Sequence, residues 1–375
     1  MKIGILKETL PEKRVAVTPE TVAALGKKGV QFIVENEAGA SALYFDEMYK
    51  EAGAEIADRK HIYNNCEIIT CVSSFTKEEL KEIPKDKILL GAFNPFTNGE
   101  LIGAFKDEGY TTFSMELIPR TTRAQAMDIL SSMATVAGYK AVLDAARLLP
   151  RFFPMFMSAA GTIKPAKVLI LGAGVAGLQA IAIARKLGAV VEVFDVRSAV
   201  KEEVMSLGGK FIEVEGATED KAAGGYAVEQ TEEFKQRQSE LIQEKALQAD
   251  VVICTAQIPG RKAPVLVKKE TVENMKAGAV VVDLAASTGG NCELTENAKT
   301  IQVGHVTIIG ESDYPSTMAY DASTMYGKNV ANFVSLMIDE EGALNLNFED
   351  DIVAGTCLTH GGEIKNERVK ANLEL

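Results

Sequence analysis

The sequence lacks the features that mark several large protein classes. Its 375 residues contain no tryptophan, three histidines and five cysteines, and no two cysteines form a C-x-x-C pair. A disulfide scaffold and a metal-ligand cluster are therefore not expected, and we interpret the cysteines as reduced and buried. No apolar run reaches the length of a transmembrane helix, and charged residues interrupt the apolar N-terminus, which argues against direct membrane insertion and against a signal peptide.

Positive charge is also scarce. The formal net charge is −12, which argues against direct binding to nucleic acid or to an anionic lipid surface. Hydrophobic residues make up 47% and charged residues 25% of the chain, as in ordinary globular proteins. A chain of this length suggests two domains, and we expect it to remain in the cytoplasm.

A glycine motif between two strand-like segments dominates the sequence. Residues 167–171 form an apolar run of strand length, and an alanine-rich helical stretch precedes a second strand at 190–194 that ends at Asp195. Between the first strand and the helix, a G-x-G-x-x-G motif is formed by Gly172, Gly174 and Gly177. Strand, glycine turn, helix, strand and acid, in this order and within about 30 residues, predict a dinucleotide-binding βαβ unit.

Each glycine of the motif has a distinct structural role. Gly172 permits a tight turn, Gly174 lets the backbone approach a pyrophosphate, and Gly177 lets the helix pack close to the strand. The helix, which would begin near Val175, offers N–H groups and a partial positive charge to phosphates. The alternative is a βα turn that binds nothing, although the flanking strands and the terminal acid favour the nucleotide site.

The residues after the second strand predict the choice of cofactor. Asp195 lies where it would accept hydrogen bonds from the adenosine ribose and repel a 2′-phosphate, which favours NAD(H) over NADP(H). Arg197 is the counter-argument, because an arginine can hold a 2′-phosphate; we weigh the acid more heavily because it stands at the strand end. We assign Asp195, Val196 and Arg197 to the adenosine end of NAD(H).

Strands alternate with helices along most of the chain, which predicts an α/β fold with two Rossmann-like doubly wound parallel-sheet domains. We expect one domain to comprise residues 1–130 plus about 320–375, and an NAD(H)-binding domain to comprise 131–319. A helical pattern over 123–149 should bridge them, and the Met- and Phe-rich segment 152–161 should pack between them.

The expected elements follow from periodicity and turn residues. A helix should begin at Pro19 with Thr18 as its N-cap. Other helices are expected at 41–52, 77–82, 100–108, 199–207, 232–247 and 322–337. Other strands are expected at 2–6, 30–34, 67–72, 87–93, 111–115, 210–214, 251–255, 279–284 and 306–309, the last being the final clear strand.

Two loops are candidates for ligand contacts. Ligands of doubly wound sheets lie beyond the carboxyl ends of the strands, which places Thr255, Ala256 and Gln257 beside the cofactor. The charged, glycine-containing segment 216–233 interrupts the strand–helix rhythm and carries Tyr226 behind two glycines. We propose a mobile lid with Tyr226 at its tip, and an ordinary solvated loop is the alternative.

Four stretches together resemble the alanine dehydrogenase and transhydrogenase superfamily: residues 1–29, 120–139, 172–197 and 281–291. The resemblance covers essentially the whole chain. In the alanine dehydrogenases of this superfamily an Arg, a Lys, a His and an Asp hold the substrate and move protons. Arg14 matches the first, but the other three positions hold Ser73, Asn94 and Ser287. Without these groups, amine oxidation lacks its general acid/base step.

The segment 119–132 resembles the signature of the NAD(H)-binding domain of proton-translocating NAD(P) transhydrogenase. The resemblance implies that four residues line the nicotinamide end: Arg120, Gln125, Asp128 and Ser131. We assign catalytic roles to Arg120, Gln125 and Asp128, because hydride transfer between two nicotinamides needs positioning more than protein protonation chemistry. The i,i+3 spacing would place Gln125, Asp128 and Ser131 on one helix face. A helix cap with a solvated polar stripe is the alternative.

The same resemblance implies partners. Gly225 and Tyr226 match the tip of a mobile loop that closes over NAD(H) in the family. We expect a homodimer that works with an NADP(H)-binding β subunit and a membrane subunit, located on the cytoplasmic side of the inner membrane through these partners. The chain stops at Leu375, so we expect a separate subunit to translocate protons. The rival enzyme is an alanine-dehydrogenase-like oxidoreductase, and the non-enzyme alternative is an NAD(H)-sensing regulator.

Overall fold

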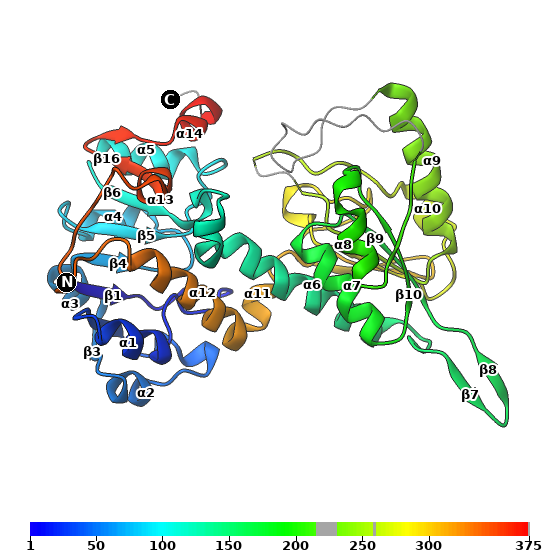
Figure 1. The fold of residues 1–375 in the computed structure, drawn as a ribbon, viewed down its shortest axis with the longest axis horizontal. Helices are drawn as coiled ribbons and strands as arrows, with labels where there is room; N and C mark the ends of the chain where they lie inside the picture. The colour runs from blue at the N-terminus through cyan, green and yellow to red at the C-terminus, as the bar shows by residue number, and fades with distance from the viewer. Residues whose placement is uncertain (215–230, 258–259, 374–375) are drawn as a thin grey trace. The chain divides into compact units, whose positions relative to one another are not determined.

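A computed structural model of the chain describes residues 1–214, 231–257 and 260–373. The chain divides into two compact units, each with its own core. Unit 1 comprises Met1–Met133 and Pro315–Leu375, and unit 2 comprises Ala134–Tyr314. Both units are mixed, mainly parallel sheets covered by helices (Figure 1), which confirms the predicted fold class.

Unit 1 contains an eight-stranded sheet in the order β17-β16-β6-β5-β4-β1-β2-β3. Its parallel strands are β1 (Lys2–Ile5), β2 (Gln31–Glu35), β3 (Glu55–Ala57), β4 (Ile68–Thr70), β5 (Ile88–Gly91) and β6 (Thr111–Ser114). The C-terminal strands β16 (Cys357–His360) and β17 (Glu363–Ile364) extend the sheet in antiparallel pairing. The order reverses between β1 and β4, as in a doubly wound fold.

The strands of unit 1 are buried on both faces, so neighbouring residues enter different cores. Ile68 belongs to one cluster and Ile69 to the other, as period-2 alternation requires. The covering helices are α1 (Pro19–Gly26), α2 (Asp46–Glu51), α3 (Arg59–Asn65), α4 (Lys77–Glu82), α5 (Gly99–Asp107), α12 (Ala319–Val334), α13 (Asp351–Thr356) and α14 (Glu367–Leu373). Thr18 occupies the N-cap of α1 as predicted, but its hydroxyl contacts that of Thr21 and caps no backbone N–H.

Unit 2 repeats this plan with a seven-stranded sheet in the order β11-β10-β9-β12-β13-β15-β14. The strands are β9 (Lys167–Leu171), β10 (Val190–Phe194), β11 (Lys210–Phe211), β12 (Val251–Cys254), β13 (Val280–Asp283), β14 (Thr300–Val303) and β15 (Val306–Ile309). Only the edge strand β14 is antiparallel among those described. The helices are α7 (Val175–Lys186), α8 (Lys201–Ser206), α9 (Glu232–Gln248) and α10 (Lys269–Glu273). Two helices contain the points where the chain passes from one unit to the other: α6 (Ile129–Leu148) and α11 (Tyr314–Thr317).

The predicted continuous helix over 123–149 is wrong at its start. Residues Thr122–Met127 form a 3₁₀ helix, η3, and Asp128 leaves the helical region with ψ of 97° before α6 begins at Ile129. The Asp128 carboxylate accepts the backbone N–H of Ser131 at 3.0 Å, as an N-cap does. Gln125 and Asp128 therefore do not share the face of one α helix. The 3₁₀ helix that carries Gln125 ends before Asp128, and the Asp128 side chain caps α6.

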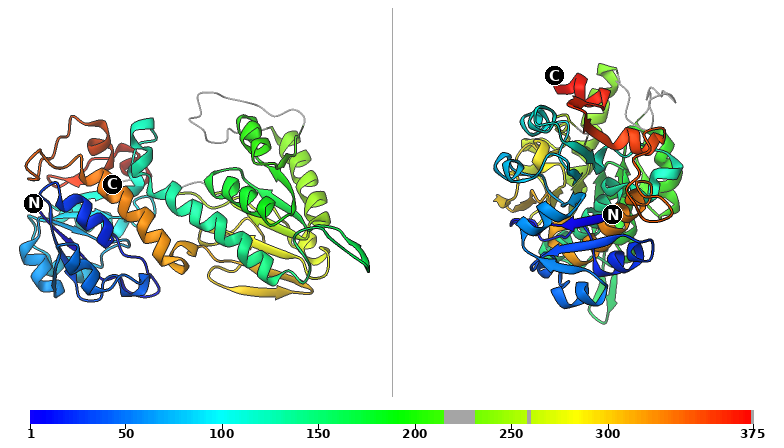
Figure 2. Two further views of the ribbon diagram at one scale, coloured as in Figure 1. Left: turned by 60° about the horizontal axis from the view of Figure 1, so that its bottom comes forward. Right: turned by 90° about the vertical axis from the view of Figure 1, so that its left-hand side faces the viewer.

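The Met- and Phe-rich segment does not fill a gap within unit 2. It forms a hairpin of β7 (Phe156–Ser158) and β8 (Gly161–Ile163) that extends outward from the body of unit 2 in both Figure 1 and Figure 2. Met157 is 74% exposed, and Met155, Phe156 and Ile163 are also exposed. Within unit 2 the segment therefore forms an exposed hairpin, and its packing between domains remains a prediction.

Strand prediction failed at the ends of both sheets. The short strands β3, β14, β16 and β17 were not expected. Val306–Ile309 is not the last strand, because β16 begins 48 residues after its end. β16 pairs with β6, whose Phe113 lies 244 residues before its partner Cys357. Within the described part of the chain, none of the helices has both the length and the apolar character needed to cross a bilayer.

Candidate functional site

The glycine motif forms a tight turn between β9 and α7. Gly172 has φ of +107°, and a Cβ there would lie 2.5 Å from the Thr255 hydroxyl. A Cβ on Gly177 would lie 2.0 Å from the carbonyl oxygen of Gly172, so only glycine allows α7 to approach the turn this closely. These two glycines therefore have the backbone roles that the sequence predicts.

Gly174 differs from its two neighbours in the motif. It is the N-cap of α7 with extended backbone geometry, and a Cβ built there meets nothing within 4 Å. The N–H groups of the first helical turn, which starts at the exposed Val175, have no acceptor within the helix. The space beside Gly174 and these donors are the features that a pyrophosphate requires.

Asp195 stands at the end of β10, beside the glycine turn. Its carboxylate accepts the N–H of Ala173 at 2.7 Å and the N–H of Arg197 at 2.8 Å. The Arg197 guanidinium donates to both carboxylate oxygens, at 2.9 and 2.8 Å. These bonds from the Asp195 side chain raise the pKa of Arg197 against the opposing effect of burial. Val196, between them, packs against the core of unit 2.

The loop after β12 lies against the glycine turn. The Thr255 hydroxyl donates to the carbonyl of Gly172 at 3.0 Å. The N–H of Ala256 is donated to the Asn291 side chain at 3.0 Å, and Gln257 donates to the Thr288 hydroxyl at 3.4 Å. The structure thus brings the Thr255–Gln257 loop, the glycine turn and Asp195 together at the carboxyl edge of one sheet, as the sequence predicts for a nucleotide site.

The second group of candidate residues belongs to η3 and the start of α6. Asp128 accepts the Ser131 hydroxyl at 2.6 Å, so these two half-buried side chains form a pair. Gln125 and Arg120 are exposed. All four residues, Arg120, Gln125, Asp128 and Ser131, belong to unit 1, whereas the glycine turn belongs to unit 2.

Three contacts within unit 1 hold η3 in place. The carbonyl of Ala126 accepts hydrogen bonds from Asn329 at 2.8 Å and from Asn332 at 3.0 Å, both on α12. Arg123 pairs with Asp350, the N-cap of α13, at 2.7 Å. This pairing lowers the pKa of Asp350 to about 2. The segment that carries Gln125 is therefore fixed from two helices. The predicted lid residues Gly225 and Tyr226 lie outside the described residues.

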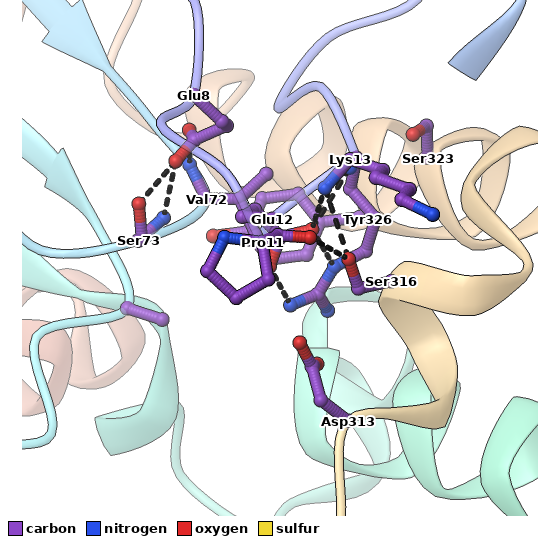
Figure 3. A network of polar contacts seen from close by, with 12 residues as sticks. Glu8, Pro11, Glu12, Lys13, Val72, Ser73, Asp313, Ser316, Ser323 and Tyr326 are labelled. Carbon is purple, nitrogen blue, oxygen red and sulfur yellow. Dashed lines mark hydrogen bonds and ion pairs between the residues drawn. The ribbon is translucent and has the colours of Figure 1, made fainter. Parts of the chain in front are cut away.

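The positions that match the alanine dehydrogenase substrate groups are occupied differently. Arg14 donates to Glu12 through Nε at 2.8 Å and through Nη2 at 2.6 Å, and both side chains are nearly buried. Burial raises the pKa of Glu12, but the hydrogen bonds and charge of Arg14 outweigh it, so the pKa is below its usual value. The same loop is tied down where Lys13 N–H donates to the Ser316 hydroxyl (Figure 3).

Ser73 contacts a half-buried carboxylate. Glu8 accepts the N–H of Val72 at 2.5 Å, and it accepts both the N–H and the hydroxyl of Ser73 (Figure 3). Burial raises the pKa of Glu8 despite these bonds. Asn94, with φ of +51°, donates its N–H to Glu116 at 3.1 Å. Two carboxylates of the chain thus bond the loops after β4 and β5.

Two polar residues of the site were missed by sequence reasoning. Asp283 and Asn291 are fully buried at the end of β13 and in the loop that follows it. Asn291 ends one of the four stretches that carry the family resemblance, but no role was assigned to it. The sequence signal that could have identified them is a polar residue at or after the end of a buried strand, because ligands of such sheets lie beyond the carboxyl ends of the strands.

Comparisons with known proteins agree with this geometry. The model of the alanine dehydrogenase/PNT N-terminal domain matches residues 4–137, and that of the C-terminal domain matches residues 141–367. The chain belongs to the alanine dehydrogenase/PNT family. This confirms the resemblance found in the sequence motifs.

Within the alanine dehydrogenase/PNT family, the transhydrogenases are the more similar branch. The first part of subunit alpha of NAD(P) transhydrogenase from Rhodospirillum rubrum is 44% identical over 374 residues, which cover 97% of each chain. A solved transhydrogenase from Sinorhizobium meliloti has a TM-score of 0.88 at 43% identity, covering 97% of this chain and 100% of the other. Alanine dehydrogenase from Bacillus subtilis is 29% identical over 385 residues, covering 100% of this chain and 95% of the other.

Proposed function

We propose that this chain is the NAD(H)-binding subunit of a proton-translocating NAD(P) transhydrogenase. The observation that carries the proposal is a contrast between two sets of positions. The glycine turn with Asp195 keeps the geometry of a dinucleotide site, whereas Arg14 is bonded to Glu12 and Ser73 is bonded to Glu8. A dinucleotide would bind, but within the described parts of the chain these positions offer no arrangement for proton transfer to a small amino acid.

The residues of unit 2 would hold the adenosine half of NAD(H). The first turn of α7 would donate N–H groups to the pyrophosphate, and the open space at Gly174 would let it approach. Asp195 would accept the ribose hydroxyls after exchanging part of its pairing with Arg197. Its negative charge would exclude a 2′-phosphate, which gives selectivity for NAD(H) over NADP(H). Thr255, Ala256 and Gln257 would line the same edge.

The residues of unit 1 would hold the nicotinamide half. NADH supplies the hydride at C4 of its nicotinamide ring, and NADP⁺ on a partner domain accepts it. Asp128 and Ser131, already bonded to each other, would fix the carboxamide and the ribose. Arg120 would pair with the carboxamide or a phosphate oxygen, and the exposed Gln125 would reach the partner nucleotide. The contribution of these groups is orientation. Gly225 and Tyr226 would close over the bound cofactor.

The chain would act in an assembly. An NADP(H)-binding β subunit would receive the hydride, and a membrane subunit would translocate protons, which would keep this chain on the cytoplasmic side of the inner membrane. Two copies would form a homodimer. The exposed apolar side chains on the β7–β8 hairpin, with Met157 at 74% exposure, support such an association because monomers rarely leave large apolar side chains together in water.

The test combines binding and turnover. NADH and NADPH are titrated into the protein, and the emission of the reduced nicotinamide is followed with excitation at a wavelength where protein side chains do not absorb. An NADP⁺-loaded partner domain is then added, and hydride transfer is measured; pyruvate with ammonium replaces the partner in a parallel reaction. Preferential binding of NADH with transfer only to the partner supports the proposal. Turnover with pyruvate and ammonium supports an alanine dehydrogenase, and binding without any transfer supports a sensor.

A further inference from the structure

Asn291 has every hydrogen-bonding group of its side chain engaged. Its Oδ1 accepts the N–H of Ala256 at 3.0 Å, while its Nδ2 donates to the carbonyls of Ala256 and Pro264, both at 2.8 Å. The side chain is fully buried. A carboxamide is the side chain that can accept from an N–H and donate to the carbonyl of the same residue in this way.

The backbone of Asn291 is equally constrained. Its N–H donates to the Asp283 carboxylate at 2.7 Å, and its carbonyl accepts the N–H groups of Leu266 and Val267 at 2.7 and 2.9 Å. Asp283 also accepts from Ala285, Cys292 and Thr295. Asn291 is therefore anchored to the end of β13, and its carboxamide presents a fixed surface to Ala256.

Ala256 connects this anchor to the glycine turn. Its neighbour Thr255 donates its backbone N–H to Leu171 at 2.8 Å and its hydroxyl to Gly172 at 3.0 Å. The Thr255 hydroxyl fills the space where a Gly172 side chain would be. A displacement of Ala256 would move Thr255 and remove a support of the turn whose N–H groups would face the pyrophosphate.

We infer that Asn291 is a positioning residue for the NAD(H) site. Through Ala256 and Thr255 it fixes the Gly172 turn, and so it governs the binding of the pyrophosphate without touching it. The inference rests on the proposed NAD(H) site. Asn291 has a different role from the residues assigned to direct contacts, because it is buried behind the loop. The N–H of Ala256 is bonded to Asn291 and is therefore not offered to the nucleotide.

The test uses the full-length protein with N291A and N291D. N291D keeps size and the acceptor but replaces the two donated hydrogens by an acceptor facing two carbonyls. The matched control is T271V, which removes one buried hydrogen bond, to Gln243 at 2.7 Å, from the same unit. Affinities for NADH, ADP-ribose and AMP are measured at a temperature where all variants are folded.

We expect both Asn291 variants to weaken NADH and ADP-ribose about tenfold, the usual cost of losing a supporting group. AMP, which lacks the pyrophosphate bridge, should change by less than twofold, and T271V should bind all three normally. An equal loss for AMP, or unchanged NADH affinity in folded variants, would overturn the inference. If the wild-type protein binds no NADH, the proposed function fails instead.

A second variant covers the case in which neither Asn291 variant folds. T255V keeps the shape of threonine and removes the bond to Gly172, the last link of the chain, while leaving Asn291 intact. It should reproduce the selective loss for NADH and ADP-ribose. Wild-type affinity for both ligands in T255V would contradict the inference.

Discussion

The two units share the order of their first five strands but differ at the crevice where that order reverses. In unit 2 the loop after β9 is a glycine turn. Among the bonds of the described residues, the Thr255 hydroxyl is the only side-chain group that joins this turn to the loop after β12. In unit 1 the loop after β1 carries Glu8, whose carboxylate bonds the loop after β4 at Val72 and Ser73. One crevice keeps open space at Gly174, and the other is bridged by a carboxylate of the protein itself.

The difference teaches where function resides in a repeated fold. A doubly wound sheet supplies a crevice at every reversal of strand order, but the residues of the two loops decide whether a ligand can use it. Small residues and free helix donors leave room for a phosphate beside Gly174, whereas in unit 1 the Glu8 carboxylate bonds the N–H groups of Val72 and Ser73 in the facing loop. The following predictions test this contrast, from the largest expected effect to the smallest.

Two alanine substitutions in the glycine motif should differ in their effect on stability. G177A places a methyl group 2.0 Å from the Gly172 carbonyl oxygen, so the turn must shift, with a loss of about 2–3 kcal/mol in unfolding free energy and of measurable NADH binding. G174A meets no protein atom and should keep the melting temperature. Its methyl group should still weaken NADH about tenfold or more, because it occupies the ligand's space.

Urea denaturation and NADH titration of both variants check this pair. A stable G177A protein would show that the close helix approach is unnecessary. Full NADH affinity in G174A would show that the space beside Gly174 is not the phosphate site.

Neutralising Asp195 should change the cofactor preference. In D195N the side chain no longer carries the charge that pairs with Arg197, so the guanidinium is released from that charged pair and a 2′-phosphate is no longer repelled, while the ribose keeps only a neutral amide acceptor. The ratio of NADPH to NADH affinity should rise about 100-fold, as expected for one charge-assisted pair gained and one lost. The double variant D195N/R197A is the control and should lose most of the NADPH gain. Equal NADPH affinity in both variants would contradict the role given to Arg197.

The acids of unit 1 should respond to pH with opposite signs. Glu12 has a lowered pKa, so it stabilises the fold above the ordinary glutamate pKa, and this contribution is lost as pH falls through the lowered value. E12Q should therefore cost about 2 kcal/mol at pH 7, and its deficit should shrink in acid.

Glu8 has a raised pKa, so its ionised form is penalised at pH 7 and the penalty is relieved as pH falls. E8Q should be within about 1 kcal/mol of the wild type at neutral pH, since a neutral amide still accepts from the loop. Urea denaturation at pH 7 and below pH 4.5, the ordinary pKa of a glutamate, compares the two variants. A larger neutral-pH loss in E8Q than in E12Q would contradict the assignment.

The hairpin should affect association and not nucleotide binding. M157D places a charge on a side chain that is 74% exposed, so the isolated fold should be unchanged. We expect weaker self-association, measured by sedimentation, with NADH affinity within twofold of the wild type, because surface changes away from a site are nearly neutral. M205D, at an exposed methionine of α8, is the matched control. A stable dimer in M157D would exclude the hairpin from the interface.

Local patterns predicted the parts of the fold that depend on neighbouring residues. The βαβ unit from 167 to 195 was predictable because glycine, apolar and acidic positions each have a local backbone reason. Helix α4 and strand β15 were located at their observed bounds. The break at Asp128 was not predicted, because the helical periodicity of the sequence continues through this residue. In the structure the Asp128 side chain accepts the N–H of Ser131 and so begins a new helix there.

Contacts between distant segments could not be predicted. Strand β16 joins β6 from the far end of the chain, and the Gly361-Gly362 turn signals its hairpin with β17 but not its distant partner. The candidate site shows the same limit: the absence of the alanine dehydrogenase groups at Ser73 and Asn94 was readable, but their bonding to Glu8 and Glu116 was not. The positioning role of Asn291 also depends on partners 27 and 35 residues away.

Amide hydrogen exchange with and without ligand tests the contrast between the two crevices most directly. NADH should slow exchange in the peptides that contain Gly172–Gly177 and Asp195–Arg197. Pyruvate, with or without NADH, should leave the peptides of the Glu8–Arg14 loop and of Ser73 unchanged. Protection of the Glu8–Arg14 loop by pyruvate, or no protection of the glycine turn by NADH, would contradict the account.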